Sequence, residues 1–500
     1  MTNSVRVERW TVAAFAAATV AAIAAPVAAR SQVLLGAVVA LAPFVAVPWI
    51  ARELPAALDG ALRRRRVVSV LWVVLAMVSV LQMGRLSAFM ADASREWGAT
   101  VPDPSAVHHQ CMSAYVYAAD LDARGVENLY DSRWYPLFDP PGPTCRIVDT
   151  PIAGLGRWVS DPFEYPPPFL LLPRAALALT HSYDAIRAGW FVIYALIFVA
   201  AAVLLARWVG GCEGIVLGLL IPAVLASLET MFNFQFGQFH MMAMMLACGA
   251  MVAFHERRTA VGGGLLAAAI LSKLFPAVLL VVLAVRREWR ALGWTAAFGT
   301  AFVLAGLVVL GPHPYAAFFG YQLPRIASGA AFGFTHEGAN ATFLASRNFS
   351  VAGVGAKLRL LGAPGGLVPL AHVASWTYTL ALIPLAVLAA RGTRTRVRNL
   401  LVWLALLNLA ALRSPIAPSY YVLAPVLWVL ALLATQVNGR RWLVFALVMA
   451  WVVVVGPPPL PDRTDLLVGL VCQAMVVGLC VVVVGWRVRG VQEAAVAPAR

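Results

Sequence analysis

Charged residues are scarce in this chain: Asp, Glu, Lys and Arg make up 12% of its 500 residues, while 61% are hydrophobic. Soluble globular proteins carry about 25% charged residues, so ordinary soluble domains are excluded. Charge-free runs of Leu, Val and Ala recur, and each is long enough to cross a bilayer core of about 30 Å as a helix. The short alternating strands of a membrane β-barrel are not the pattern seen. The composition therefore predicts an integral membrane protein.

Acidic residues are also in short supply, 23 against 38 basic ones, which leaves a net charge of +15. In a soluble protein this excess would suggest a nucleic-acid partner. Here the whole excess falls in clusters between apolar runs, such as Arg63–Arg66, on the side of the N-terminus. Cytoplasmic loops carry such positive charge. We therefore expect a multi-pass protein of the bacterial inner membrane with both termini cytoplasmic, and no nucleic-acid partner.

The hydrophobic pattern predicts an all-α polytopic fold with about fourteen spans, in a single integral membrane domain over residues 1–500. The segment from Phe169 to Thr180 contains Pro173 and Arg174 and is interpreted as re-entrant or interfacial, because a full crossing there would invert every later loop. The expected spans lie near 11–29, 33–51, 67–86, 188–206, 214–231, 241–254, 261–272, 275–286, 292–311, 366–390, 399–412, 419–434, 442–456 and 466–486.

Two external segments, near 87–168 and 312–360, are far longer than connectors and collect most of the polar residues. The first contains a helical pattern from Tyr115 to Arg124, a turn after Gly125, and Glu164 beside the membrane re-entry. Such loops usually carry function, so we expect the active face to be external.

Cysteines are few, six in all, and two of them, Cys111 and Cys145, share the first external loop. A disulfide between these two is plausible in an oxidising external compartment, and two unpaired thiols are the alternative. Metal-ligand spacing is also lacking, since His108 and His109 are adjacent rather than four residues apart. We expect no metal and no cofactor.

Lys273 interrupts an apolar hairpin between two cytoplasmic arginine clusters, so the tip of that hairpin points outward. An unpaired ammonium is costly in an apolar setting, and the phosphate of a lipid would neutralise it. The alternative is that the side chain extends to the interface without a functional role.

An ordered set of motifs extends from about Tyr115 to Tyr421. Together they resemble glycosyltransferase family 87 of the GT-C superfamily, which includes mannosyltransferases that use polyprenol-phosphate-mannose. The matching residues are Gly125, Asn128 and Tyr130 in the first loop, Tyr165, Pro166 and Pro167 at the re-entry, Gly237 and Gln238, Lys273 and Pro276, Asn348 and Ser350, and Ser414, Pro415 and Ile416.

The chain departs from the family pattern at two places. Family members place an aspartate, the presumed catalytic base, just ahead of the first-loop helix, where this chain has Cys111. After Ser-Pro-Ile the family commonly shows histidines, whereas this chain has Ser419, Tyr420 and Tyr421. The resemblance thus leaves the sugar, the acceptor and the base open.

Transfer from a polyprenyl phosphate requires a base for the acceptor hydroxyl, cations for the departing phosphate and an apolar groove for the lipid. A direct displacement needs only one base and inverts the anomeric configuration. His109, His108 and Asp103 are the base candidates nearest the family position, although a histidine pair in a polar loop can equally make surface hydrogen bonds. The expected substrate-binding residues are Lys273, Arg413, Arg347, Gln238, Asn348, Glu164, Tyr165, Glu337 and Tyr420.

The predicted function is a membrane glycosyltransferase that moves a sugar, mannose first, from a lipid-linked donor to a glycolipid or polysaccharide acceptor of the cell envelope. A non-catalytic accessory subunit with the same scaffold is one alternative, because of Cys111. A lipid or sugar transporter is the other, although the chain shows no internal repeat of the kind transporters use.

Overall fold

A computed structural model of the protein describes residues 10–28, 53–63, 66–96, 98, 109–135, 155, 158–328, 330–331, 341–364, 367–391, 395–436 and 461–485. Most of these residues are helical, and the two named strands are two residues each and pair in parallel. The predicted all-α class of a membrane protein is therefore confirmed.

In the first half of the chain the elements are α2 (Trp10–Ala28), α4 (Glu53–Arg63), α5 (Arg66–Ala91), β1 (His109–Gln110), α7 (Cys111–Ala123), η1 (Ser132–Trp134), β2 (Val159–Ser160), η2 (Pro167–Leu170), α8 (Leu171–Leu179), α9 (Tyr183–Val209), α10 (Gly211–Ala226), α11 (Leu228–Gln235) and α12 (His240–His255).

In the second half they are α13 (Thr259–Ser272), η3 (Phe275–Ala277), α14 (Val278–Val285), α15 (Trp289–Leu310), α16 (His313–Ala317), the π-helical turn η4 (Phe318–Gln322), α17 (Leu323–Ser328), α18 (Ala341–Arg347), α19 (Val351–Leu360), α20 (Leu367–Arg391), α21 (Arg396–Ala411), α22 (Ser419–Gln436) and α24 (Asp462–Gly485).

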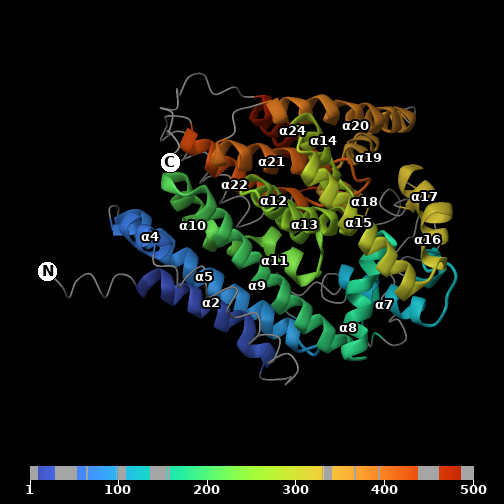
Figure 1. Cartoon of the computed structure of the whole chain (residues 1–500), viewed down its shortest axis with the longest axis horizontal. Helices are drawn as coiled ribbons and strands as arrows, with labels where there is room; N and C mark the ends of the chain where they lie inside the picture. The colour runs from blue at the N-terminus through green and yellow to red at the C-terminus, as the bar shows by residue number, and fades with distance from the viewer. Residues whose placement is uncertain are drawn as a thin grey trace.

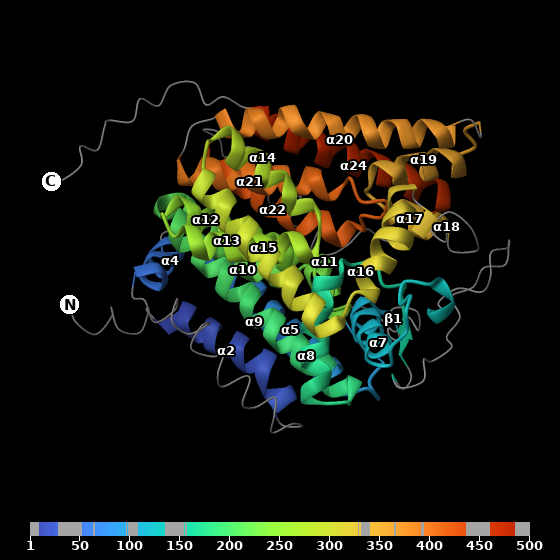
Figure 2. The ribbon, with the colours of Figure 1, turned by 45° about the vertical axis from the view of Figure 1, so that its right-hand side comes forward.

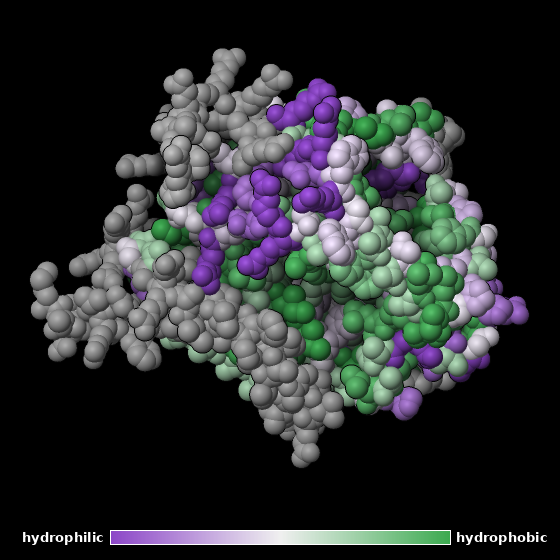
Figure 3. All heavy atoms as spheres, in the orientation of Figure 1, coloured by the Kyte–Doolittle hydropathy of each residue, from purple (hydrophilic) through white to green (hydrophobic). Residues whose placement is uncertain are grey.

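The long helices follow one another across the molecule from the N-terminal to the C-terminal side (Figures 1 and 2). Helices α2 and α5 pack together on one side, next to α9 and α10. Helices α12, α13 and α15 lie in the middle, followed by α21 and α22, with α20 and α24 on the opposite side. Hydrophobic surface separates the hydrophilic patches on the visible face (Figure 3), as a membrane protein requires.

The predicted count of fourteen spans is only partly matched. Among the described residues, six helices are long and apolar enough to cross a membrane, or seven if α10 and α11 form one broken span. Helices α12, α13 and α14 coincide with expected spans but have 16, 14 and 8 residues, fewer than the roughly 20 that a full crossing needs. The expected spans near 33–51 and 442–456 lie outside the described residues.

The expected re-entrant segment forms the short helix α8, preceded by the 3-10 turn η2. Together they cover only Pro167–Leu179, which is too short for a crossing, and the re-entrant or interfacial position of this segment stays a prediction.

Helices α10 and α11 form a continuous apolar segment that bends by 62°. The bend lies at Ser227, whose hydroxyl accepts a hydrogen bond from the backbone N–H of Thr230 at 3.3 Å and so caps the new helix. The expected single span near 214–231 is therefore broken. The bend redirects α11 and the Gly237–Gln238 turn towards α7.

Helix α13 packs tightly between α12 and α15. A Cβ at Gly263 would lie 2.5 Å from the Cβ of Trp294 on α15, so only glycine permits this approach. Helix α13 ends at Lys273, whose backbone is extended at φ −150° and ψ 129°, and Pro276 lies in the first turn of η3. The hairpin is thereby interrupted at Lys273, as the sequence predicts.

The loop elements α7, α8, α16 and α17 gather at one end of the helical body (Figure 2). Helix α7 begins at Cys111, four residues earlier than predicted, and its end is followed by Gly125 at φ +75°, a conformation that favours glycine. Strands β1 and β2 pair in parallel, with His109 opposite Val159 and Gln110 opposite Ser160. This pairing joins the two ends of the first long loop.

Candidate active site

A buried hydrogen-bonded group lies between α7, the re-entry and the start of α12. The hydroxyl groups of Tyr115 and Tyr165 are 2.6 Å apart. Both donate to Oε1 of Gln238, Tyr165 at 2.7 Å and Tyr115 at 3.2 Å. The other end of the amide, Nε2, donates to Sγ of Cys111 at 3.3 Å. The first-loop helix, the re-entry and the Gly-Gln motif are thus one connected unit.

The Gly-Gln motif has a steric reason in this packing. Gly237 has φ +61°, and a Cβ there would lie 2.8 Å from the Cβ of Met112. The carbonyl of Phe236 accepts a hydrogen bond from the N–H of Met112 at 3.0 Å. The turn therefore touches α7 directly, which places the amide of Gln238 against Cys111.

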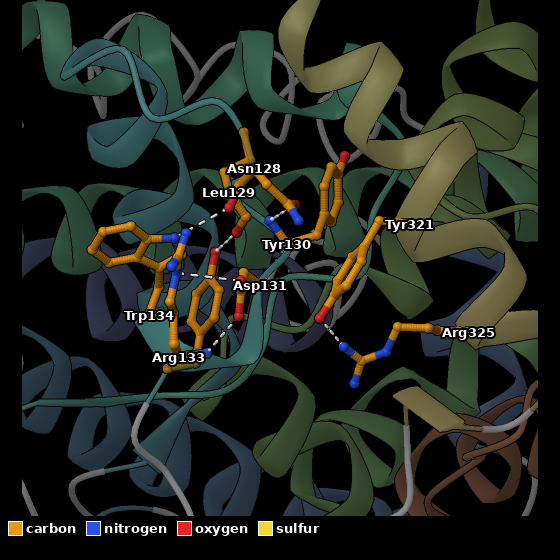
Figure 4. Close-up of polar contacts among 9 residues, drawn as sticks. Asn128, Leu129, Tyr130, Asp131, Arg133, Trp134, Tyr321 and Arg325 are labelled. Atoms are coloured by element: carbon orange, nitrogen blue, oxygen red, sulfur yellow. Dashed lines mark hydrogen bonds and ion pairs between the residues drawn. The ribbon is translucent and has the colours of Figure 1, made fainter.

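The turn after α7 supports the re-entry from the other side (Figure 4). Oδ1 of Asn128 accepts a hydrogen bond from the N–H of Tyr130 at 3.1 Å, and the carbonyl of Asn128 accepts one from Nε1 of Trp134 at 3.1 Å. The hydroxyl of Tyr130 donates to the carbonyl of Tyr165 at 2.9 Å. The Asn-x-Tyr motif therefore positions the backbone of Tyr165.

Lys273 faces this group from the break in the hairpin. Its Nζ lies 4.6 Å from the ring centroid of Tyr165 and 4.9 Å from that of Tyr421, and it donates to the Tyr421 hydroxyl at 3.4 Å. His240 stacks between Tyr421 and Phe275, at centroid distances of 4.1 and 4.5 Å. Lys273, Tyr165 and Gln238, three of the predicted substrate-binding residues, are thus brought together.

Glu164 places a carboxyl group beside Lys273. Burial raises the pKa of the Glu164 carboxyl well above its usual range, and the charge of Asp161 adds to the rise. Lys273 and Arg325 act in the opposite direction. Arg325 comes from the second long loop, where its guanidinium hydrogen-bonds the hydroxyl of Tyr321 and lies 4.7 Å from that ring centroid (Figure 4). Both long loops therefore contribute to the site.

Tyr420, at the start of α22, connects this site to a second buried carboxyl group. It interacts with both Cys111 and Glu229. Ser419 donates to Oε2 of Glu229 at 3.3 Å, and the carbonyl of Tyr420 accepts from Nδ2 of Asn233 at 2.6 Å. Tyrosines thus occupy the helix start where the family resemblance implies histidines.

Three predicted substrate-binding residues have other partners. Oδ1 of Asn348 accepts from the N–H groups of Ser350 and Ala417, both at 3.0 Å, and its Nδ2 donates to the carbonyl of Pro415 at 3.2 Å. Its amide therefore holds the Ser-Pro-Ile segment, and its contact with substrate stays a prediction. Arg347 forms an ion pair with Asp465 at 3.7 Å, and Arg413 hydrogen-bonds Thr379 beside the ring of Trp376.

The base candidates are not placed by the structure. Asp103, His108 and Glu337 lie outside the described residues, and of His109 only the backbone in β1 is described. Cys111 is a free, buried thiol instead of half of a disulfide, because its sulfur is turned inward to Gln238. Its expected partner Cys145 lies outside the described residues.

Two charged residues at the site, Asp161 and Arg325, were not predicted from the sequence. The Asp161 carboxylate is hydrogen-bonded to the Cys111 thiol, and Arg325 interacts with Glu164. Asp161 has one local signal, since it directly follows the strand residues Val159 and Ser160. Arg325 has none, because a short helix in a long loop carries no periodic pattern.

The described residues contain no group of three or more His, Cys, Asp and Glu side chains placed to hold a metal ion.

A comparison with family models matches residues 163–415 to the model for glycosyltransferase family 87. The match covers half of the chain and includes Glu164, Gln238, Lys273 and Arg325. It begins just after Asp161 and leaves out α7. No curated protein matches the chain, and no solved structure does either.

Proposed function

The chain belongs to glycosyltransferase family 87 and is a membrane glycosyltransferase; from this premise we propose that it uses a polyprenyl-phosphate sugar as donor, with mannose as the first candidate sugar. The acceptor we propose is a glycolipid or polysaccharide of the cell envelope. The observation that carries the proposal is the setting of Lys273 at the break of an apolar hairpin.

The cation of Lys273 has weak partners for its location. Among the described residues it lies over two ring faces, makes one long hydrogen bond of 3.4 Å, to Tyr421, and has the Glu164 carboxyl nearby. A phosphate oxygen would form a shorter and stronger charge-assisted bond with it. Nε2 of His240, which stacks on Tyr421, is buried without a hydrogen-bond partner among the described residues. Both observations support a polar ligand at this position.

Negative charge develops on the phosphate as the sugar leaves it. Lys273 and Arg325 both face Glu164, so a donor phosphate placed beside that carboxyl would meet two cations. The apolar helices around the site suit the polyprenyl chain of the donor. One direct displacement by the acceptor hydroxyl would invert the anomeric carbon.

We place the reaction on the external face of a bacterial inner membrane, with both termini cytoplasmic. The support is the distribution of charge in the sequence, since the basic excess belongs to the loops opposite the site. Glu164 and Arg325 come from the two long loops expected on the external side.

The test is transfer of radiolabelled mannose from polyprenyl-phosphate-mannose to an extract of cell-envelope lipids by purified protein in detergent. We expect product from the wild type and a loss of about 100-fold in kcat/KM for Lys273→Ala, the scale of one lost charge stabiliser in a transition state. Lys273→Arg, which keeps the charge, should retain more activity.

The matched control is Arg124→Ala, which removes an exposed cation whose partner Asp120 lies 2.7 Å away on the surface of α7. It should transfer at the wild-type rate. An inactive wild type with every lipid-linked sugar would contradict the proposed donor class and favour an accessory role. Full activity of Lys273→Ala at limiting donor would remove this residue from the phosphate site.

A further inference from the structure

The proposed transfer needs a group that accepts the proton of the acceptor hydroxyl. Three carboxyl groups among the described residues interact with residues of the candidate site. Asp161 interacts with Cys111, Glu164 with Lys273 and Glu229 with Tyr420. They differ in their neighbours. Glu164 faces the cations Lys273 and Arg325, and Glu229 accepts a hydrogen bond from Ser419. Asp161 is partly exposed and lies beside Cys111.

The strand register explains why Asp161 lies there. In the parallel pair, His109 is opposite Val159 and Gln110 is opposite Ser160, and Cys111 and Asp161 are the residues that directly follow the two paired strands. Neighbouring strands lie about 4.8 Å apart. The hydroxyl of Ser113 also donates to the carbonyl of Val159 at 2.6 Å, which ties the first turn of α7 to β2. A carboxylate at position 161 therefore reaches the region that the side chain at position 111 occupies.

The thiol of Cys111 can orient the Asp161 carboxylate. Burial and the neighbouring Asp161 charge raise the pKa of the Cys111 thiol, so it stays protonated near neutral pH. Its sulfur accepts a hydrogen bond from Gln238 at 3.3 Å, and its S–H can donate to the Asp161 carboxylate. Cys111 is thus suited to positioning and Asp161 to proton transfer.

We propose that Asp161 is the general base of the transfer and that Cys111 is its positioning residue; this inference rests on the proposed function. The acceptor oxygen bonds to the anomeric carbon while its proton moves to the Asp161 carboxylate. The bond between the anomeric carbon and the phosphate oxygen breaks, and the electron pair leaves with the polyprenyl phosphate beside Lys273. The proton then passes to solvent, which the partly exposed carboxyl can reach.

The test removes the carboxylate at position 161 and then introduces one at position 111. Asp161→Asn should lower kcat about 100-fold, within the usual range for a general base, while leaving the KM for the polyprenyl-phosphate sugar near the wild-type value. The double variant Cys111→Asp/Asp161→Asn returns a carboxylate to the same region and should recover at least a tenth of the wild-type kcat. Cys111→Ser should lower kcat less than Asp161→Asn.

The control is Asp120→Asn, which changes an exposed carboxylate on the surface of α7 and should leave kcat unchanged. Wild-type kcat in Asp161→Asn, with an active wild type, would overturn this inference alone. An equal loss in Asp161→Asn and the double variant, with both folded by gel filtration, would also overturn it. An inactive wild type would instead count against the proposed function. The outcomes therefore separate the two proposals.

Discussion

The chain contains only two lysines, and they lie in contrasting surroundings. Lys357 on α19 is fully buried, and its Nζ donates to the carbonyl of Asn348 at 2.7 Å and to Oε1 of Gln473 at 2.9 Å. Lys273 faces two tyrosine rings and makes a single long hydrogen bond of 3.4 Å. Both are lysines in apolar sequence, but among the described residues Lys357 makes two short hydrogen bonds and Lys273 makes one long one.

The hydrogen bonds around Lys357 hold α19 and α24 together. Gln473 on α24 accepts from Lys357 and donates to the carbonyls of Phe349 and Ser350, both at 2.7 Å. Burial lowers the pKa of Lys357 to about 8. The comparison shows that burial of a lysine does not by itself indicate function, because Lys357 is fully buried and its hydrogen bonds hold the fold together.

The largest expected effect comes from the pair of variants Lys357→Met and Lys273→Met. Lys357→Met leaves two buried acceptors without a donor, so we expect a loss of about 1–3 kcal/mol in stability and unchanged transfer per folded molecule. Lys273→Met should behave oppositely, with an unchanged apparent Tm and little transfer. Thermal unfolding in detergent, followed by the radiolabel assay, measures both. A lower Tm for both variants would contradict the distinction between a lysine that stabilises the fold and one that acts in transfer.

A smaller effect is expected from Glu164→Gln, and it depends on pH. The raised pKa of Glu164 keeps this carboxyl neutral until the pH exceeds the usual carboxylate range. Above its pKa the carboxylate competes with the donor phosphate for Lys273 and Arg325, so the donor KM of the wild type should rise severalfold with pH. Glu164→Gln should show a flat donor KM over the same range. A parallel rise in both proteins would exclude this competition.

The smallest effect is expected for Arg325→Ala. Arg325 is partly exposed, and exposed charges are screened by solvent and salt. We expect the donor KM to rise about threefold, with a smaller rise at high salt, and kcat to stay near the wild-type value. Donor titrations at two salt concentrations measure this. A loss in kcat as large as that of Lys273→Ala would show that the two cations contribute equally to transfer, in contrast to Lys357.

Part of the site could be predicted from local sequence. Lys273, Tyr165 and Gln238 were predicted from their motifs, and the structure brings them together. Asn348 was also found by its motif, but its contacts hold the backbone of Pro415 and Ala417. A motif records that a side chain is needed at a position, and contacts across the fold determine whether it holds the backbone or faces the site.

The membrane character, the all-helical class, the family and the break at Lys273 could be predicted from local sequence. These follow from composition, from the length of apolar runs and from motifs within a few residues. Only the tertiary structure decided that Asp161 lies beside Cys111 and that Arg325 faces Glu164. Residues 111 and 161 directly follow two short parallel strands, and the register of such strands is set by packing between distant segments.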